Sequence, residues 1–437
     1  FVPSVCISNK RKCIFMEKFL MVLFLLLFVC RMVTRYLLQN MNVKNLKLKG
    51  KEIPQVFKGE IDEGILSKTV EYTADQSRLE SKEALTGDIV ELAVLFLLLP
   101  VLAGRLVHMD VHPIVQALIF FGVLAALSGL AGLPFNLYHT FVLEKKYGFS
   151  TITWKLWLAD FLKSIVISAI LLAILIGALM AFILYLPKSW WLWGWIFFTL
   201  FQLVLLWLYP VLIAPLFNQF EPIKDDALRD QILRMVEKAG LRTQGIYQVD
   251  EGRRSRHTNA YFTGIGKTKR IVLYDTLLAS HTHDEIVSVL AHEIGHWKKK
   301  HILKQLVFMI LASGVLFYLI YRVAGWTPLY GAFGLDQTPV YAGLFLVSVY
   351  LSAAAFFFKP LGAAMTRRFE READRMAFDL TGTVQPMISA LKRLAKDNLS
   401  NLHPHPWYVK FYYSHPPLVE RIEYLRAMDY KSSKLQE

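Results

Sequence analysis

Seven long apolar stretches alternate with polar segments along the chain. A helix needs about 20 mostly apolar residues to cross the ~30 Å hydrocarbon layer of a bilayer. The stretches that suit such helices cover residues 19–33, 89–106, 114–137, 161–186, 190–208, 306–324 and 340–358. The first is short, but no small-residue cleavage site follows it and Arg31 and Arg35 flank it, which favours a retained anchor. The pattern predicts a mainly α, polytopic membrane protein with about seven transmembrane helices.

The polar segment between the fifth and sixth stretches has the pattern of a small folded domain. An apolar repeat with helical spacing is followed by Gly240 as a stop, and its members are Leu228, Ile232, Met235 and Val236. Strand-like runs follow at 245–249, 259–263 and 270–274. Gly264 and Gly266 suggest a hairpin between the last two runs, so we expect a short β-sheet.

Composition narrows the class of protein further. Of 437 residues, 54% are hydrophobic and 19% are charged, which is too apolar for one large soluble core and excludes intrinsic disorder. The net charge of +14 then indicates a membrane protein with basic aqueous loops and no nucleic-acid partner. The three cysteines lie at positions 6, 13 and 30, so no disulfide framework or cysteine metal site is expected in the rest of the chain.

The distribution of lysine and arginine predicts the orientation. Seven crossings place residues 34–88, 139–160, 209–305 and the C-terminal tail on one side of the membrane. That side carries Lys145, Lys146 and Lys155 in a short loop, whereas the opposite turns offer little beyond Lys188. By the positive-inside rule, the basic side is cytoplasmic. The basic residues at 10–12 oppose this orientation unless translation begins at Met16.

The residues with catalytic or metal-binding potential follow the predicted strands. Thr282 and Glu285 form a T-x-x-E capping box that opens a helix, and His292, Glu293 and His296 on that helix spell H-E-x-x-H. Histidines four residues apart share a helical face and can bind one Zn²⁺, and the adjacent glutamate can act as general base toward a water molecule. The motif therefore predicts a zinc-dependent hydrolase with one zinc ion.

A catalytic zinc needs a third protein ligand. Glu370 and Asp374 share one face of a later helix, so Glu370 is the predicted ligand, Asp374 the residue that orients a ligand histidine, and Glu372 points away. Asp374, His405 and His415 remain alternatives for the third ligand. His415 and Arg421 are candidates to stabilise an oxyanion, with His403 and His405 as competitors for that role. Residues 259–263 are a candidate edge strand for a peptide substrate.

Several of these segments together resemble type I CAAX prenyl endopeptidases, integral-membrane zinc metalloproteases of the a-factor converting enzyme type. The resemblance covers about residues 42–428 and rests on FNLY at 135–138, EKKYGF at 144–149, IAPLFN at 213–218, NAY at 259–261, AHEIGH at 291–296, FEREAD at 369–374, SHP at 414–416, and Arg421. The compact chain, with short non-cytoplasmic turns, looks closer to bacterial members.

The resemblance implies a gluzincin site that faces a water-filled chamber enclosed by seven helices. It implies His292, His296 and Glu370 as zinc ligands, Glu293 as general base and Asp374 as orienter. It also implies His415 and Arg421 as intermediate stabilisers and Asn259 as a contact to the substrate backbone, with Ala260 and Tyr261 beside it in the substrate-binding strand. The expected activity is cleavage of a peptide or protein substrate, which in eukaryotic members is a prenylated CAAX protein that loses its last three residues. In a bacterium, membrane-protein processing or quality control is expected.

Two other functions fit the apolar stretches less well. An intramembrane site-two type protease carries H-E-x-x-H inside a span, but here three lysines follow at 298–300, and at ~2.5–3.5 kcal/mol each they would cost about 8–10 kcal/mol at the bilayer centre. A seven-span receptor or transporter would leave the histidines and the downstream carboxylates unexplained.

The predicted organisation has five parts: an N-terminal extension (1–16), a membrane region with five spans and the cytoplasmic loop 34–88 (17–218), a zinc protease core (219–301), a membrane hairpin (302–365) and a C-terminal catalytic segment (366–437). The predicted location is a bacterial plasma membrane, or the endoplasmic reticulum membrane in a eukaryote, with the active site toward the cytoplasm.

Overall fold

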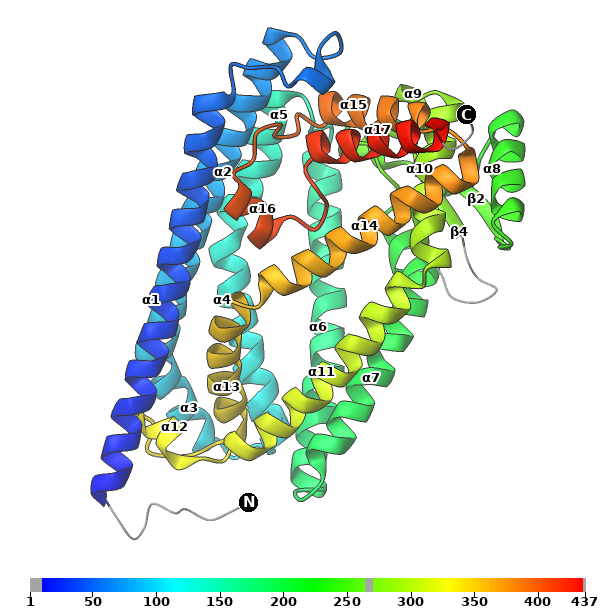
Figure 1. Ribbon diagram of the computed structural model, residues 1–437. Coiled ribbons are helices and arrows are strands. Elements are labelled where there is room, and N and C mark those ends of the chain that lie inside the picture. Colours follow the sequence, from blue (N-terminus) through cyan, green and yellow to red (C-terminus); the bar gives the residue numbers. More distant parts are fainter. Residues whose placement is uncertain (1–9, 264–269, 435–437) are drawn as a thin grey trace.

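The computed structural model describes residues 10–263 and 270–434 and consists mainly of long helices (Figure 1). Among the described residues, six helical segments are long and apolar enough to cross a membrane: 11–49, 63–107, 113–147, 154–185, 190–216 and 301–323. Their principal helices are α1 (Lys10–Lys49), α2 (Glu63–Ala93), α3 (Leu99–Val107), α4 (Pro113–Tyr138), α5 (Glu144–Tyr147), α6 (Trp154–Tyr185), α7 (Trp190–Leu208) and α11 (His301–Val323). Single π turns at Val94–Leu98, His139–Leu143 and Tyr209–Ile213 join or extend several of them.

A seventh crossing is broken into two helices. α13 (Val340–Phe356) continues after a short break into α14 (Lys359–Thr381), and the two axes differ by 55°. Pro360 lies in the first turn of α14, where its missing N–H leaves no hydrogen bond unmade. The predicted class, a polytopic and mainly helical membrane protein with about seven spans and a small sheet, is therefore confirmed.

The segment predicted as the cytoplasmic loop 34–88 has a different structure. α1 continues to Lys49 and α2 begins at Glu63, so most of this segment extends two membrane helices into the aqueous phase. These extensions mix polar and apolar residues, so they contain no long apolar run that would mark them as helices. Arg31 on α1 donates to Asp88 and Glu91 on α2, at 3.3 and 2.6 Å, and helps hold the two helices together.

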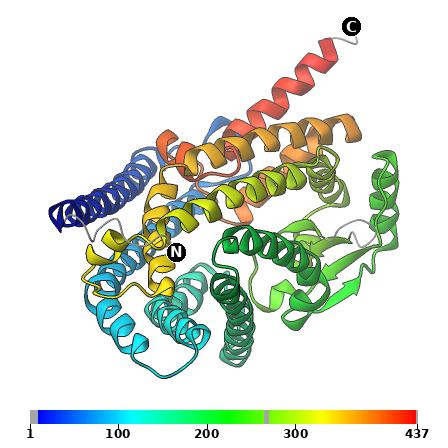
Figure 2. The same ribbon diagram turned by 90° about the horizontal axis from the view of Figure 1, so that it is seen from below.

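A four-stranded sheet lies at one side of the molecule, with α1 at the opposite side (Figures 1 and 2). Its strands are β1 (Phe220–Pro222), β2 (Gly245–Val249), β3 (Ala260–Thr263) and β4 (Arg270–Tyr274), in the order β1-β2-β4-β3. β2 and β4 are parallel, and the other two pairs are antiparallel. The three predicted strands and the antiparallel pairing of the last two are confirmed, although the glycines of the predicted turn lie outside the described residues. β1 was missed from the sequence, and β3 is an edge strand as predicted.

The sheet packs against α8 (Asp226–Lys238) and α10 (His283–Lys298). Their shared apolar core contains Ile232, Ile271, Leu290 and Ile294, all fully buried. The remaining elements are the short helices α9 (Asp275–Ser280), α12 (Thr327–Gly331) and α16 (Pro406–Tyr412), the longer α15 (Gln385–Asp397) and α17 (Leu418–Lys434), and 3₁₀ turns at Gln55–Phe57, Ala214–Leu216 and Glu251–Arg253.

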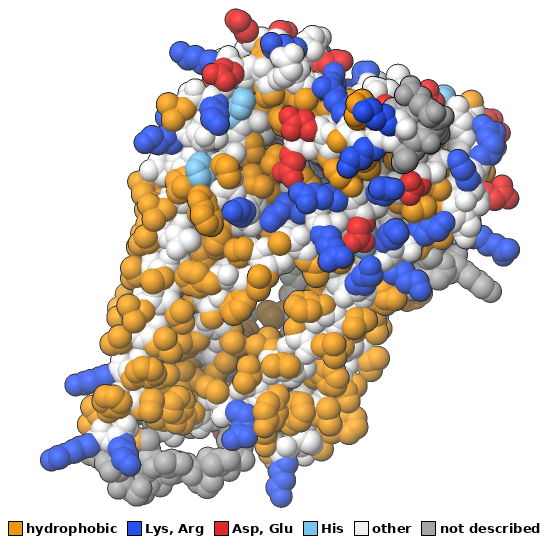
Figure 3. Space-filling model, in the orientation of Figure 1, with side chains coloured by type: hydrophobic (Ala, Val, Ile, Leu, Met, Phe, Trp, Pro, Cys, Tyr) orange, Lys and Arg blue, Asp and Glu red, His pale blue; other side chains and the backbone are white. Residues whose placement is uncertain are grey.

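The surface separates into an apolar zone and a charged zone. Apolar side chains cover the lower part of the molecule, and charged side chains gather at the end that carries α15, α17 and the sheet (Figure 3). α14 crosses between the two zones, and the exposed lysines 298–300 lie where α10 meets α11. A cavity of about 440 Å³ opens between α2, α4 and α13, while the larger chamber implied by the resemblance stays a prediction.

A polar network joins the membrane helices to the segment that leads into β3. The His257 ring lies 2.8 Å from Asn398 Oδ1 and 3.0 Å from Glu144 Oε2, and Tyr72 donates to the other oxygen of Glu144 at 2.7 Å. Each ring nitrogen of His257 thus faces an acceptor oxygen. Only the protonated imidazole carries an N–H on both nitrogens and can donate to both oxygens. Burial lowers the pKa of His257, but the hydrogen bonds to Glu144 and Asn398 outweigh it and raise that pKa above its ordinary value of 6.5.

We expect His257→Gln to lower the unfolding temperature, with a pH-dependent difference from the unsubstituted protein. A group whose pKa is raised on folding stabilises the fold fully below its unfolded pKa, and this contribution is lost as the pH rises through the folded pKa. The difference in unfolding temperature between the two proteins should be largest near pH 6 and shrink toward pH 8.5. Thermal unfolding in detergent measures it. His108→Gln, at an exposed histidine, is the control, and a difference that does not change with pH would contradict the assignment.

Candidate metal centre

α10 presents a buried apolar face to the sheet and its two motif histidines to the opposite side. The predicted capping box is present: Thr282 accepts from the Glu285 backbone N–H at 3.4 Å, and the Glu285 carboxylate accepts from the Thr282 N–H at 2.8 Å. Glu285 also accepts a hydrogen bond from Ser389 on α15, which fixes the start of the helix against the C-terminal segment. The cap therefore sets where the helix begins and which side His292 and His296 face.

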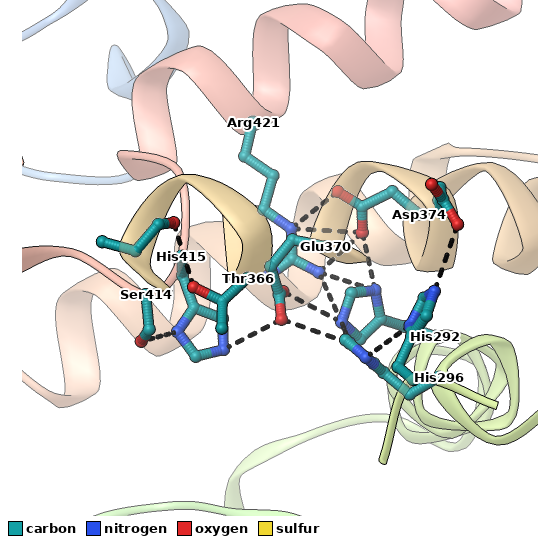
Figure 4. Close-up of polar contacts among 11 residues, drawn as sticks. His292, His296, Thr366, Glu370, Asp374, Ser414, His415 and Arg421 are labelled. Atoms are coloured by element: carbon teal, nitrogen blue, oxygen red, sulfur yellow. Dashed lines mark hydrogen bonds and ion pairs between the residues drawn. The ribbon is translucent and has the colours of Figure 1, made fainter. Parts of the chain in front are cut away.

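α10 and α14 approach each other unusually closely beside these histidines. A Cβ at Gly295 would lie 2.8 Å from Ala373 Cα and 2.9 Å from its carbonyl oxygen. Real side chains do not make such contacts with a backbone, so the crossing requires glycine here. It brings Glu370 and Asp374 of α14 onto the histidine face of α10 (Figure 4).

His292, His296 and Glu370 converge on one point. His292 Nε2 lies 3.1 Å from His296 Nε2 and 3.2 Å from Glu370 Oε2, and His296 Nε2 lies 3.2 Å from Glu370 Oε1. Ligands at 2.0–2.2 Å from a tetrahedral zinc are about 3.3 Å apart, so the three side chains have the spacing of such a site. Within the described ranges, Glu370 Oε2 is buried and receives no hydrogen bond. The donor set, the spacing and this unsatisfied oxygen fit a bound metal ion.

Asp374 and Arg421 contact the Nδ1 side of the His292 ring. Asp374 is fully buried; its Oδ1 lies 2.7 Å from His292 Nδ1, and it accepts from Arg421 Nη2 and Nε at 2.6 and 2.9 Å. Arg421 Nη2 also lies 2.9 Å from His292 Nδ1, and the other ring nitrogen, Nε2, lies toward His296 and Glu370. Nε and Nη2 of Arg421 donate to Asp374, and Nη1 lies 4.0 Å from Glu370 Oε2; the role of Arg421 toward an oxyanion stays a prediction.

His292 competes for a proton when no metal is bound. Burial and Arg421 lower the pKa of His292, but the carboxylates of Asp374 and Glu370 outweigh them and raise it to about 9. A metal that binds Nε2 must displace this proton, so metal affinity is expected to fall as the pH decreases.

The other predicted histidines separate into two groups. His415 reaches the cluster, with Nε2 3.3 Å from Glu370 Oε1 and Nδ1 2.9 Å from Ser414 Oγ, and 63% of its side chain is exposed. His403 donates to the Glu52 carbonyl, and His405 caps α16 by accepting from the Trp407 N–H. The structure therefore places His403 and His405 in loop contacts and leaves His415 at the open side of the cluster.

Glu293 lies beside His292 on α10, and burial raises the pKa of its carboxyl above the ordinary value. The edge strand lies next to the same helix, where Phe262 packs against Trp297 with ring centroids 5.4 Å apart. Asn259 is exposed immediately before β3, Ala260 is buried and Tyr261 is half-buried. The predicted substrate-binding residues thus lie on β3 or immediately before it, beside the histidine helix.

Comparisons with known proteins agree with this arrangement. The family described as "CAAX prenyl protease N-terminal, five membrane helices" matches residues 42–219, and peptidase family M48 matches residues 222–429. CAAX prenyl protease 1 of Saccharomyces cerevisiae is 33% identical over 421 residues, covering 89% of this chain and 91% of its own. The chain belongs to the CAAX prenyl protease 1 family. It is a membrane-embedded metallopeptidase, and the receptor or transporter alternative is wrong.

Other members of the family extend the comparison. The human CAAX prenyl protease 1 homolog is 32% identical over 361 residues, covering 72% of this chain and 75% of its own. The crystal structure of S. mikatae Ste24p superposes with a TM-score of 0.86 at 28% identity, covering 93% of this chain and 99% of that chain. These relatives are eukaryotic, so they do not test the expected likeness to bacterial members, which stays a prediction.

We expect Gly295→Ala to destabilise the protein by about 1–3 kcal/mol, because the added methyl group forces two helix backbones apart. The same displacement should weaken metal binding, since the histidines and Glu370 lie on opposite sides of the crossing. Chemical unfolding and metal content of the purified protein measure both effects. Gly362→Ala on α14 is the matched control, because a Cβ there meets nothing within 4 Å. Equal behaviour of the two variants would show that the close crossing is unimportant.

Proposed function

We propose that this chain is a zinc metalloendopeptidase that cleaves prenylated CAAX proteins near their C-terminus, with its active site toward the cytoplasm. The convergence of His292, His296 and Glu370 at 3.1–3.2 Å carries this proposal. The names of the relatives support the substrate class, and the basic charge of the predicted cytoplasmic segments supports the orientation.

In this proposal, His292, His296 and Glu370 hold the metal, and a bound zinc ion supplies Lewis acidity toward the scissile carbonyl and toward water. Glu293 accepts a proton from the attacking water and returns it to the leaving amine. Its raised pKa suits both transfers, because a base that is too weakly basic does not take the proton and one that is too strongly basic does not return it.

The substrate peptide is proposed to extend along β3. One edge of β3 is paired with β4, and the other is a sheet edge whose backbone groups can bind an extended chain. Asn259 lies exposed at the start of this edge, and Ala260 and Tyr261 continue it.

His415 is the proposed donor to the oxyanion, because it is the exposed imidazole of the cluster and lies on the side away from Asp374. Asp374 is a positioning residue that fixes the His292 ring. We assign Arg421 the same kind of role through Asp374, in place of the direct contact to the intermediate that the sequence suggests.

We expect Glu293→Gln to abolish cleavage of a farnesylated CAAX peptide while zinc remains bound, because the amide cannot accept the water proton. Product analysis by mass spectrometry and zinc content of the same preparation check this. Glu423→Gln, at an exposed glutamate of α17, is the control and should retain full activity. Appreciable turnover by Glu293→Gln would remove Glu293 from the role of general base.

The same assay tests the metal and the substrate class. A zinc chelator should stop cleavage and added zinc should restore it, and Glu370→Ala should lose the metal. Equal cleavage of the unprenylated peptide would show that the lipid is not recognised, whereas cleavage that resists the chelator would contradict metal catalysis.

A further inference from the structure

A buried histidine lies at the elbow where α10 ends and the membrane helix α11 begins. His301 is the first residue of α11 and is 1% exposed. The preceding Lys300 has a left-handed backbone (φ 57°), which is uncommon for a residue with a side chain. This conformation turns the chain sharply and brings the His301 ring back toward α10.

The His301 ring is held on three sides. It stacks on Phe369, the residue before Glu370, with centroids 4.2 Å apart and an interplanar angle of 9°. Its Nδ1 lies 3.1 Å from His296 Nδ1, and its Nε2 lies 3.2 Å from Glu372 Oε2. Glu372 in turn accepts from Arg368 at 3.1 Å. His301 therefore bridges a carboxylate of α14 and a metal-site histidine of α10.

The chemistry of this chain of contacts fixes where the protons lie. The Glu372 carboxylate can only accept, so His301 Nε2 donates to it. A neutral imidazole then has an acceptor at Nδ1, which must receive the proton of His296 Nδ1. His296 is left with its lone pair on Nε2, the nitrogen that lies 3.1–3.2 Å from His292 and Glu370.

We propose that His301 and Glu372 are positioning residues that fix the tautomer and orientation of His296, so that its Nε2 binds the metal. The inference rests on the metal site of the proposed function and adds two residues to it. It parallels the contact of Asp374 with His292, with the difference that Glu372 points away from the cluster and reaches His296 only through His301.

The arrangement also connects the metal site to the membrane. Because His301 begins α11, the contact with His296 depends on how this membrane helix leaves α10. Without the His301 contact, the His296 ring can rotate or change its tautomer. Either change means that the Nε2 lone pair no longer points to the metal position.

Zinc affinity of the purified full-length protein in detergent, measured by competition with a chromophoric chelator, tests the inference. We expect His301→Phe, which keeps an aromatic ring against Phe369, to weaken zinc binding about 10–100-fold. Glu372→Ala should weaken it in the same direction, and Glu372→Gln, which keeps an acceptor oxygen, should restore part of the loss. The double variant His301→Phe with Glu372→Ala should be no weaker than His301→Phe alone, because both residues act through one chain.

His108→Phe, at an exposed histidine, is the control for the substitution itself. If His301→Phe does not fold, Glu372→Ala carries the test, since the Glu372 side chain is 31% exposed and its removal leaves no large cavity. Affinities of both variants within twofold of the unsubstituted protein would overturn this inference alone. An unsubstituted protein that binds no zinc would overturn the proposed function and this inference together.

Discussion

The contact between the backbones of α10 and α14 at Gly295 and Ala373 is the constraint on which the rest of the site depends. Imidazoles come from one helix and carboxylates from the other, and the two sequences are more than seventy residues apart. Only a crossing without an intervening side chain lets His292 and His296 meet Glu370 at 3.1–3.2 Å. The capping box at Thr282 and the apolar face of α10 set the rotation of the helix at this crossing.

The cluster concentrates charge in a buried place. Two histidines, two carboxylates and the Arg421 guanidinium lie together, and Glu370, Asp374 and Arg421 are each less than a tenth exposed. Buried charges are stable only when each is paired, and removal of one partner is strongly destabilising. The pairing of Asp374 with both His292 and Arg421 meets this requirement, and a metal ion would meet it for Glu370. The exposed lysines at 298–300 directly follow the histidine helix, and such a charged run is costly inside a hydrocarbon layer.

Local patterns predicted much of this structure. Apolar length predicted the spans, the T-x-x-E pattern predicted the start of α10, and strand-like runs predicted three of the four described strands. β1 was missed because it has only three residues and one of them is proline. The helices at 34–49 and 63–88 were missed because helices that leave a membrane carry mixed side chains. His301 has no local signal after three lysines, and its partner Glu372 lies 71 residues away. Distance in the sequence likewise hid the pairing of Arg421 with Asp374.

Anomalous diffraction at the zinc absorption edge, from crystals of the metal-loaded protein, tests the central claim most directly. The account predicts one peak about 2.0–2.2 Å from His292 Nε2, His296 Nε2 and a carboxylate oxygen of Glu370. A peak on Nδ1 of either histidine, a peak that His415 or Asp374 binds in place of Glu370, or no peak in protein that still cleaves peptides would contradict it.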